Sequence, residues 1–183
     1  MENELIELFE DANREFLRNN KELFVIEISE QTLCGALMIE FHEVIKQRNL
    51  TGYYVDVEYN RHIIDEITVE KKTAQGPIKM HLGIRSDLIV HSRGKMNRDN
   101  LIALEMKKAC KNDKKKKADR DRLMALTASP GIIEVPSDLE KILVFGYELG
   151  IFYDVDLEKA IINVEFYQAG KKSGERQYKL CDY

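Results

Sequence analysis

Apolar residues recur along the chain with two different periods, and these periods predict the order of helices and strands. Residues 2–19 carry apolar side chains near helical spacing, which predicts an amphipathic helix. A second helix is predicted over Glu30–Gln47, with Ser29 as its N-cap and an apolar stripe along one face. The segment Tyr53–Tyr59 alternates and is rich in aromatic and β-branched residues, so it is predicted to be a strand.

The middle of the chain contains two short apolar segments joined by a polar turn. Residues Asp87–His91 and Asn100–Lys108 are predicted to be strands, and the short polar connection between them favours an antiparallel hairpin. The segment Arg61–Gly83 gives no clear pattern, although Ala74–Pro77 has the composition of a turn.

The remaining segments predict one more helix and further strands. The helix is expected over Asp119–Ser129, after a lysine-rich segment and before an interruption at Pro130. Residues 142–156 and 158–170 are predicted to be strands, and the polar tail 171–183 is either a short edge strand or loose. This order indicates an α/β fold in which a mixed central β-sheet is flanked by helices on at least one face.

Length and composition agree with a single domain over residues 1–183, in which helix 1–20 is peripheral or oligomerising. A hydrophobic content of 44% is enough for a core and excludes global disorder. The three cysteines are far apart and match no zinc-ligand pattern, so buried or incidental thiols are expected. Because we find no long apolar run and no basic, apolar leader, we expect a cytoplasmic protein with no membrane partner.

Charge is distributed unevenly along the chain. The whole chain has a formal net charge of −4, yet the segment Arg85–Arg122 contains 13 basic and 6 acidic residues. Such asymmetry agrees with a surface that meets a polyanion such as nucleic acid, although it does not establish one.

The strand Asn100–Lys108 combines a buried-type apolar run with an acid and a base. Glu105 and Lys107 share one face of this strand, because alternate side chains of a strand point the same way. Burying both costs several kcal/mol unless each has a partner, and a divalent cation would compensate the carboxylate. In the predicted hairpin, Asp87 lies across from Glu105, so two carboxylates would form a hard-oxygen site suited to Mg²⁺ or Mn²⁺. Such a metal polarises a phosphodiester and activates water.

Asp87 followed by a hairpin and Glu105-Met106-Lys107 resembles the motif of the PD-(D/E)xK nuclease superfamily, with Ser86 in place of the usual proline. The chain also resembles a group of small bacterial nuclease-like proteins. The four segments that carry this second resemblance are Glu58–Arg61, Asp87–His91, Asn100–Lys108 and Asp119–Leu123.

The resemblance implies a restriction-endonuclease-like sandwich and a set of site residues. Asp87, Glu105 and the Met106 carbonyl would ligate Mg²⁺ or Mn²⁺, and Lys107 would position the nucleophile or stabilise the transition state. It also implies an acid from the first core helix, for which we choose Glu30, with Glu40 as the rival on the apolar stripe. Residues expected to bind nucleic acid are Arg61, Arg93, Lys108 and Lys111.

These observations lead to one main functional prediction and to alternatives. The main prediction is a metal-dependent nuclease that hydrolyses phosphodiester bonds of DNA, in phage defence or repair. The alternative is a catalytically inactive nuclease-like protein with a nucleic-acid-binding or regulatory role. A further option is a homodimer that forms through helix 2–19. The simpler interpretations also stay open. Glu105 and Lys107 would be a solvated pair at a strand end, and the basic run Lys107, Lys108, Lys111 and Lys114–Lys117 would be a solvated, mobile loop.

Overall fold

The computed structural model describes residues 2–26, 28–58, 66–73, 76–83, 86–108, 113–128, 133–134 and 146–183. Within these ranges, the α-helices are α1 (Glu2–Asn19), α2 (Glu30–Gln47) and α3 (Asp113–Leu126), and short 3₁₀ turns cover Lys21–Phe24 and Leu180–Asp182. None of the helices in the described ranges combines the length and the apolar character that crossing a membrane requires.

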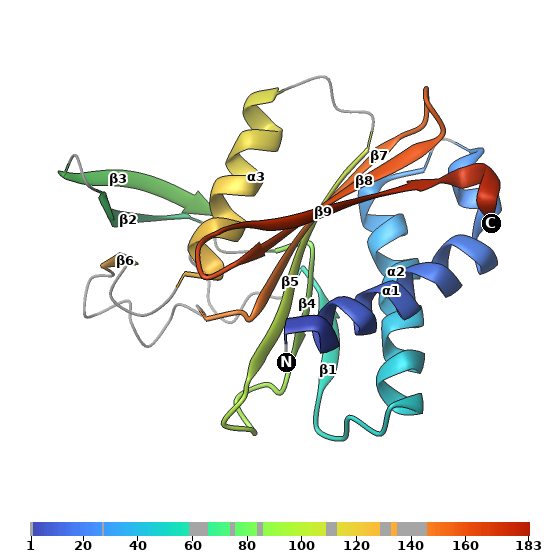
Figure 1. Ribbon diagram of the computed structural model, residues 1–183, viewed down its shortest axis with the longest axis horizontal. Coiled ribbons are helices and arrows are strands. Elements are labelled where there is room, and N and C mark those ends of the chain that lie inside the picture. The colour runs from blue at the N-terminus through green and yellow to red at the C-terminus, as the bar shows by residue number, and fades with distance from the viewer. Residues whose placement is uncertain are drawn as a thin grey trace.

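The larger sheet is mixed, as the sequence predicted. Its strands are β1 (Tyr54–Val57), β4 (Leu88–His91), β5 (Asn100–Lys108), β7 (Leu149–Asp156), β8 (Ile161–Gln168) and β9 (Lys171–Lys179), in the order β1-β4-β5-β7-β8-β9. All neighbours are antiparallel except β5 and β7, which are parallel because α3 lies in the connection between them. Figure 1 shows α1 and α2 on one side of this sheet and α3 on the other.

The layer formed by α1 and α2 covers the main core. Ser29 caps α2 by accepting a hydrogen bond from the Thr32 amide, as expected for an N-cap. Phe9 of α1 is fully buried and meets Tyr153 of β7 edge-on, with ring centroids 6.2 Å apart. The apolar face of α1 is therefore covered by the rest of the same chain.

The layer formed by α3 covers a smaller apolar cluster on the opposite face. Its members come from β4, β5, β7, β8, the end of α3 and the segment just before β7: Ile89, Ala103, Leu123, Leu126, Tyr147, Phe152 and Tyr167. Ion pairs fasten α3 at the side of this cluster, since Lys116 lies 2.6 Å from Asp154 and Arg120 lies 2.7 Å from Glu165. This helix is held close enough to the sheet to bring its polar residues to the end of β5.

A second sheet was not predicted from the sequence. It comprises β2 (Glu66–Thr73), β3 (Gly76–Gly83) and β6 (Ile133–Glu134), in the order β3-β2-β6. Strands β2 and β3 form an antiparallel pair in which Thr73 pairs with Gly76. Of the predicted turn Ala74–Pro77, residues 74 and 75 lie outside the described residues, and Gly76 and Pro77 belong to β3. The alternation of Ile78, Met80 and Leu82 was the available signal for β3, but the charged residues of β2 obscured its partner.

Two other predictions at the ends of elements were wrong. Helix α3 begins at Asp113 and not at Asp119, so Lys114–Lys117 are helical and the expectation of a loop was incorrect. Lysine is a good helix former, but a run of lysines has no apolar period to reveal the helix. Strand β7 begins at Leu149, later than predicted, and the tail left open as short or loose forms the nine-residue strand β9.

Gly150 of β7 lies against the C-terminal end of α3. A Cβ atom at this position would come within 3.0 Å of Thr127 Cγ2 and 3.1 Å of Tyr167 Cβ. We expect Gly150→Ala to lower the free energy of unfolding by about 1–3 kcal/mol, because the added methyl group overpacks this contact. Urea denaturation measures the change. The control is Gly35→Ala in α2, where a Cβ atom meets nothing within 4 Å; an equal loss in both variants would contradict the packing argument.

Candidate functional site

The register of β4 and β5 brings Asp87 and Glu105 together, as predicted. Leu88 pairs with Leu104 in this antiparallel ladder, so the next residues outward, Asp87 and Glu105, lie opposite one another on the same face. The Asp87 carboxylate also accepts a hydrogen bond from the Met106 amide at 2.8 Å. The carboxylate of Asp87, which precedes β4, is therefore held against the end of β5 that carries Glu105.

Glu105 is fully buried and contacts α3. Its Oε2 atom accepts a hydrogen bond from Nη1 of Arg122 at 2.6 Å, and the same Nη1 lies 3.3 Å from Asp119 Oδ1. Since Glu105 is 0% exposed, the interpretation of Glu105 and Lys107 as a solvated pair is wrong for the acid. Within the described part of the chain, the other oxygen, Oε1, has no hydrogen-bond partner.

Lys107 links the two helical layers at the end of β5. Its Nζ atom lies 3.4 Å from Glu30 Oε2 of α2 and 3.3 Å from Asp119 Oδ2 of α3. The second oxygen of Glu30 accepts a hydrogen bond from the Lys108 amide at 2.9 Å. Of the two rival helix acids, Glu30 thus reaches the predicted site, whereas Glu40 accepts a hydrogen bond from Asn19 of α1.

The other predicted residues near β5 have protein partners. The Met106 carbonyl, an expected metal ligand, accepts a hydrogen bond from Lys107 Nζ at 3.0 Å. The ammonium of Lys108, expected to bind nucleic acid, instead donates to the Ile28 carbonyl at 2.6 Å. Beneath these groups, Cys34 Sγ lies 3.7 Å from Met106 Sδ.

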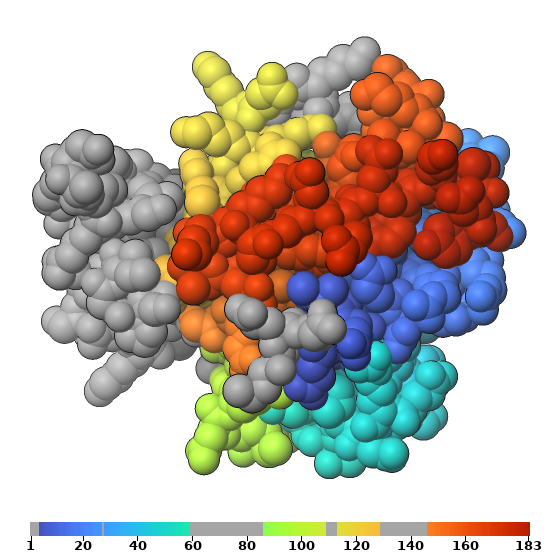
Figure 2. Space-filling view, in the orientation of Figure 1, coloured from blue at the N-terminus to red at the C-terminus, as the bar shows by residue number. Residues whose placement is uncertain are grey.

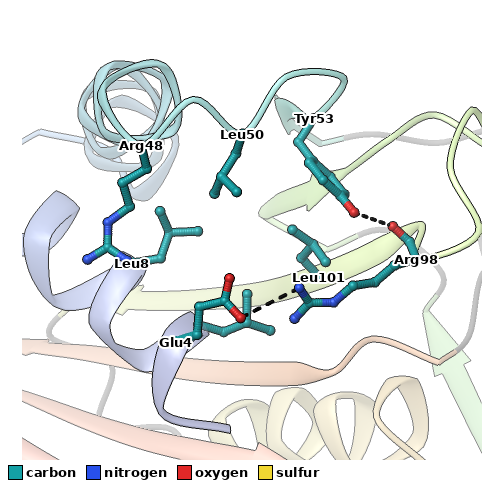
Figure 3. Close-up of a pocket in the computed structure, with 8 residues that line it drawn as sticks. Glu4, Leu8, Arg48, Leu50, Tyr53, Arg98 and Leu101 are labelled. Atoms are coloured by element: carbon teal, nitrogen blue, oxygen red, sulfur yellow. Dashed lines mark hydrogen bonds and ion pairs between the residues drawn. The ribbon is translucent and has the colours of Figure 1, made fainter. Parts of the chain in front are cut away.

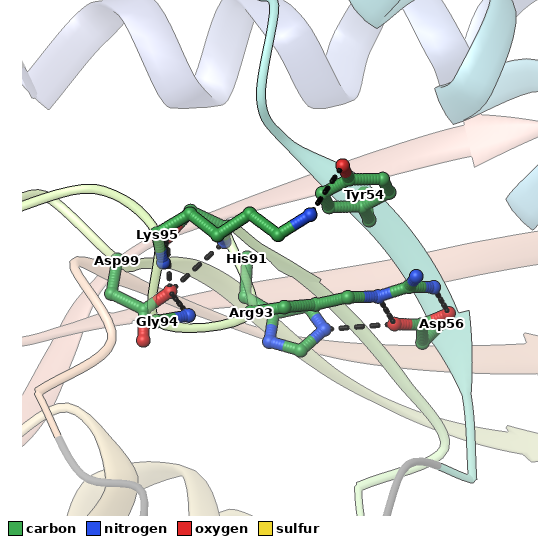
Figure 4. Close-up of polar contacts among 8 residues, drawn as sticks. Tyr54, Asp56, His91, Arg93, Gly94, Lys95 and Asp99 are labelled. Carbon is green, nitrogen blue, oxygen red and sulfur yellow. Dashed lines mark hydrogen bonds and ion pairs between the residues drawn. The ribbon is translucent and has the colours of Figure 1, made fainter.

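Arg93 lies past the opposite end of β4 from Asp87. Its guanidinium reaches back to Asp56 of β1 with two hydrogen bonds, of 2.6 and 3.0 Å, and His91 contacts the same carboxylate at 2.8 Å. Figure 4 shows these side chains converging on Asp56 while Lys95 extends to Tyr54. The structure thus does not place Arg93 among the residues around Lys107. The remaining predicted contacts, Arg61 and Lys111, lie outside the described residues.

Six residues form what we call the acid–base cluster: Glu30, Asp87, Glu105, Lys107, Asp119 and Arg122. Four of them were predicted from the sequence as site residues, whereas Asp119 and Arg122 were not. Both lie in the segment Asp119–Leu123 that supported the family resemblance, and their i, i+3 spacing on a helix was the signal that they share a face.

Burial governs the electrostatics of the acid–base cluster. Burial raises the pKa of Glu105 to about 8, because the loss of solvation outweighs the favourable effect of Arg122. Burial also raises the pKa of Asp87. For Lys107, burial acts to lower the pKa, but the surrounding acids, Asp119 first, reverse this and hold the ammonium charged.

Burial likewise keeps the thiol of Cys34 neutral. Its pKa lies well above the ordinary value, first because the thiol is buried and then because Asp87, Glu105 and Glu30 are nearby anions. A thiolate nucleophile needs the opposite environment, so this cysteine is a packing residue beside the cluster.

The acid–base cluster has an excess of negative charge. With every group ionised, its four carboxylates outnumber Lys107 and Arg122 by two charges, which equals the charge of one divalent cation. The buried, unpaired Oε1 of Glu105 is a hard-oxygen donor of the kind that Mg²⁺ and Mn²⁺ prefer. Among the residues that the structure describes, no three His, Cys, Asp or Glu side chains are arranged to hold a metal ion. Lys107 Nζ contacts both Glu30 and Asp119, and Arg122 Nη1 contacts both Glu105 and Asp119. The donor set therefore fits a divalent cation chemically, while the arrangement requires these nitrogens to move.

A pocket of about 310 Å³ opens beside the acid–base cluster at the start of α2. Glu30, Cys34, Glu58 and Asp87 are among its lining residues, so it gives access to two of the four cluster acids. A second pocket, of about 230 Å³, lies between α1 and the start of β5. Figure 3 shows Glu4 directed to the guanidinium of Arg98, and the Tyr53 hydroxyl directed to the Arg98 backbone carbonyl, in this second pocket. Arg48, which also lines the pocket, pairs with Asp11, so the charged groups of this pocket are already paired.

Comparisons of the chain with protein-family models, with curated proteins and with solved structures find no match.

The raised pKa of Glu105 predicts how stability depends on pH when metal is removed with EDTA. The unfolded chain releases this proton near its ordinary pKa of 4.5, whereas the folded protein holds it until about pH 8. Stability from this group is therefore present at low pH and is lost as pH rises from about 5 to about 8, with a slope on the order of 1 kcal/mol per pH unit. Glu105→Gln cannot titrate, so its unfolding free energy should fall less steeply over this range.

Urea denaturation at half-unit pH steps measures both slopes. Asp87 has a shift in the same direction, so some dependence should persist in the variant. Identical slopes in wild type and Glu105→Gln would show that Glu105 is ionised throughout.

Proposed function

We propose that this protein is a metal-dependent nuclease with a restriction-endonuclease-like fold that hydrolyses phosphodiester bonds of DNA. The observation that carries the proposal is the meeting of Asp87, Glu105 and Lys107 at the adjoining ends of β4 and β5. Glu105 is buried there with one oxygen unpaired among the described residues, which is a costly arrangement unless it serves a ligand.

The arrangement of the elements also supports the proposal. Helix α2 supplies Glu30, β4 begins just after Asp87, β5 supplies Glu105 and Lys107, and α3 lies on the other face. A mixed sheet between helical layers is what the resemblance to PD-(D/E)xK nucleases led us to expect. The finer assignment to that superfamily remains part of the proposal.

In this proposal the residues at the adjoining ends of β4 and β5, together with Glu30, have distinct roles. Asp87, Glu105 and the Met106 carbonyl would hold Mg²⁺ or Mn²⁺, which supplies Lewis-acid polarisation of the phosphate and a more acidic bound water. Lys107 would orient the attacking water and balance the charge that develops on the phosphate oxygens. Glu30 holds the Lys107 ammonium and the Lys108 amide, so it fixes the lysine at the end of β5.

The first turns of α3 form a basic surface that, in this proposal, contacts the phosphate backbone. Lys114, Lys115 and Lys117 are exposed there, and α3 follows β5 directly in the order of elements. Figure 2 shows this helix (yellow) on the surface of the molecule. Exposed lysines in this position would attract a polyanion towards the acid–base cluster.

One observation favours the alternative of a nucleic-acid-binding protein without turnover. Lys107 and Arg122 already occupy the Met106 carbonyl and one oxygen of Glu105, so protein groups fill two of the expected ligand positions. In that case the lysines of α3 would bind nucleic acid, and divalent cations would have no effect on the substrate.

The nuclease proposal predicts Mg²⁺- or Mn²⁺-dependent cleavage of DNA that depends on the buried acid. We expect Glu105→Gln to lower the cleavage rate at least about 100-fold, because it removes a charged ligand of the metal. Gel assays with single- and double-stranded DNA and with RNA measure cleavage and identify the preferred nucleic acid.

Glu40→Gln is the matched control, since it makes the same substitution on α2 at a residue whose carboxylate accepts a hydrogen bond from Asn19, away from the acid–base cluster. Its cleavage rate should equal that of the wild type. Two results would contradict the nuclease proposal: cleavage by Glu105→Gln at the wild-type rate, or no cleavage by the wild-type protein with either metal. The second result would favour the nucleic-acid-binding protein without turnover.

The basic end of α3 predicts a salt-dependent contribution to nucleic-acid binding. We expect the double variant Lys114→Gln/Lys117→Gln to bind DNA more weakly. It should also reduce the slope of log K against log salt by about 0.9 for each phosphate that the wild-type lysines neutralise. Fluorescence anisotropy at salt concentrations from about 50 to about 200 mM would measure the slope.

The double variant Lys171→Gln/Lys179→Gln removes the same charge from the two ends of β9 and should leave the slope nearly unchanged. Equal effects from the two double variants would indicate attraction by total charge alone and would contradict a specific surface on α3.

A further inference from the structure

Arg122 contacts the buried acid through a single nitrogen. Its Nη1 lies 2.6 Å from Glu105 Oε2, while Glu105 Oε1 and Arg122 Nε have no hydrogen-bond partner among the described residues. The side chains of Arg122 and Glu105 are 19% and 1% exposed, and the unpaired atoms themselves are buried. This ion pair therefore leaves one donor and one acceptor unsatisfied, which is costly in a buried position.

Other arginines of the same protein pair more completely. Arg98 binds Glu148 through Nε and Nη2 at 2.6 and 2.8 Å. Arg120, two residues before Arg122 on α3, binds Glu165 through Nε and Nη2 at 2.7 and 3.2 Å. Bidentate pairing is the favoured geometry for arginine and a carboxylate. Glu105 and Arg122 lack it, so a competing cation would break their contact more readily than the pairs of Arg98 and Arg120.

Asp119 offers Arg122 a second place in the cluster. Its Oδ1 atom lies 3.3 Å from the same Nη1, one helical turn away on α3. Arg122 can thus release Glu105 and still be paired with an acid. With every group ionised, the carboxylates of the cluster exceed its bases by two, so the cluster as a whole would then accept a divalent cation without losing a positive charge.

We propose that Glu105 exchanges Arg122 for a divalent cation, and that Arg122 then pairs with Asp119 alone. This inference rests on the proposed metal-dependent function and assigns Arg122 as a positioning residue that fills the place of the cation when metal is absent. A monovalent cation replaces one positive charge by another and gains little. The exchange therefore favours Mg²⁺ or Mn²⁺ over Na⁺ or K⁺.

Mn²⁺ binding to the full chain tests the exchange independently of cleavage. We expect Arg122→Gln to bind Mn²⁺ at least about 10-fold more tightly than wild type in calorimetry, because the cation no longer has to break an ion pair. Arg120→Gln is the matched control: it removes the same charge from the same helix but breaks the pair with Glu165, and its affinity should change little.

A second measurement uses the unaltered protein and does not depend on how well a variant folds. The side-chain Nε–Hε signal of Arg122 in nuclear magnetic resonance should shift when Mg²⁺ is added, while that of Arg120 stays in place. An Arg122 signal that is unchanged at saturating Mg²⁺, or equal Mn²⁺ affinities in wild type and Arg122→Gln, would overturn the exchange.

The outcomes also separate this inference from the proposed nuclease. Tighter binding in Arg122→Gln together with a shifted Arg122 signal, but no cleavage by wild type, would support the exchange and reject the nuclease. Metal-dependent cleavage by wild type, with no gain in Mn²⁺ affinity in Arg122→Gln, would support the nuclease and reject the exchange. If neither wild type nor Arg122→Gln binds Mn²⁺ at millimolar concentration, both proposals fail.

Discussion

The antiparallel register of β4 and β5 decides where the charged residues of this protein meet. The pairing of Leu88 with Leu104 puts Asp87 opposite Glu105, and a slip of one residue would turn the acids to different faces. The register is set firmly because both strands are buried: Leu88, Val90, Ile102 and Leu104 are each 0% exposed. The apolar core on one face thus fixes the position of charged groups on the other.

Much of this arrangement followed from the sequence because it depends on local rules. The bounds of α2, its Ser29 cap and the hairpin of β4 and β5 all come from short-range periodicity and from turn composition. The same rules identified Asp87, Glu105 and Lys107 as neighbours. Register and alternation are properties of adjacent residues, so one chain is enough to predict them.

Features that depend on distant contacts could not be predicted in the same way. The sequence did not show that Arg122 would reach Glu105, because that contact requires the packing angle of α3 against the sheet. Nor did it show that Arg93 would turn back to Asp56, or that Lys108 would bind the Ile28 carbonyl. Long basic side chains have many rotamers, and their partners are chosen by tertiary structure.

One edge of the larger sheet has a consequence for how two copies of this chain could associate. Strand β9 lies at that edge and carries charged residues along most of its length. If two copies extended the sheet by pairing β9 symmetrically about Glu175, that glutamate would face its own copy and Lys171 would face Lys179. Like charges opposite one another destabilise a ladder. The composition of β9 therefore acts against continuation of the sheet between molecules, and it directs any self-association to another surface.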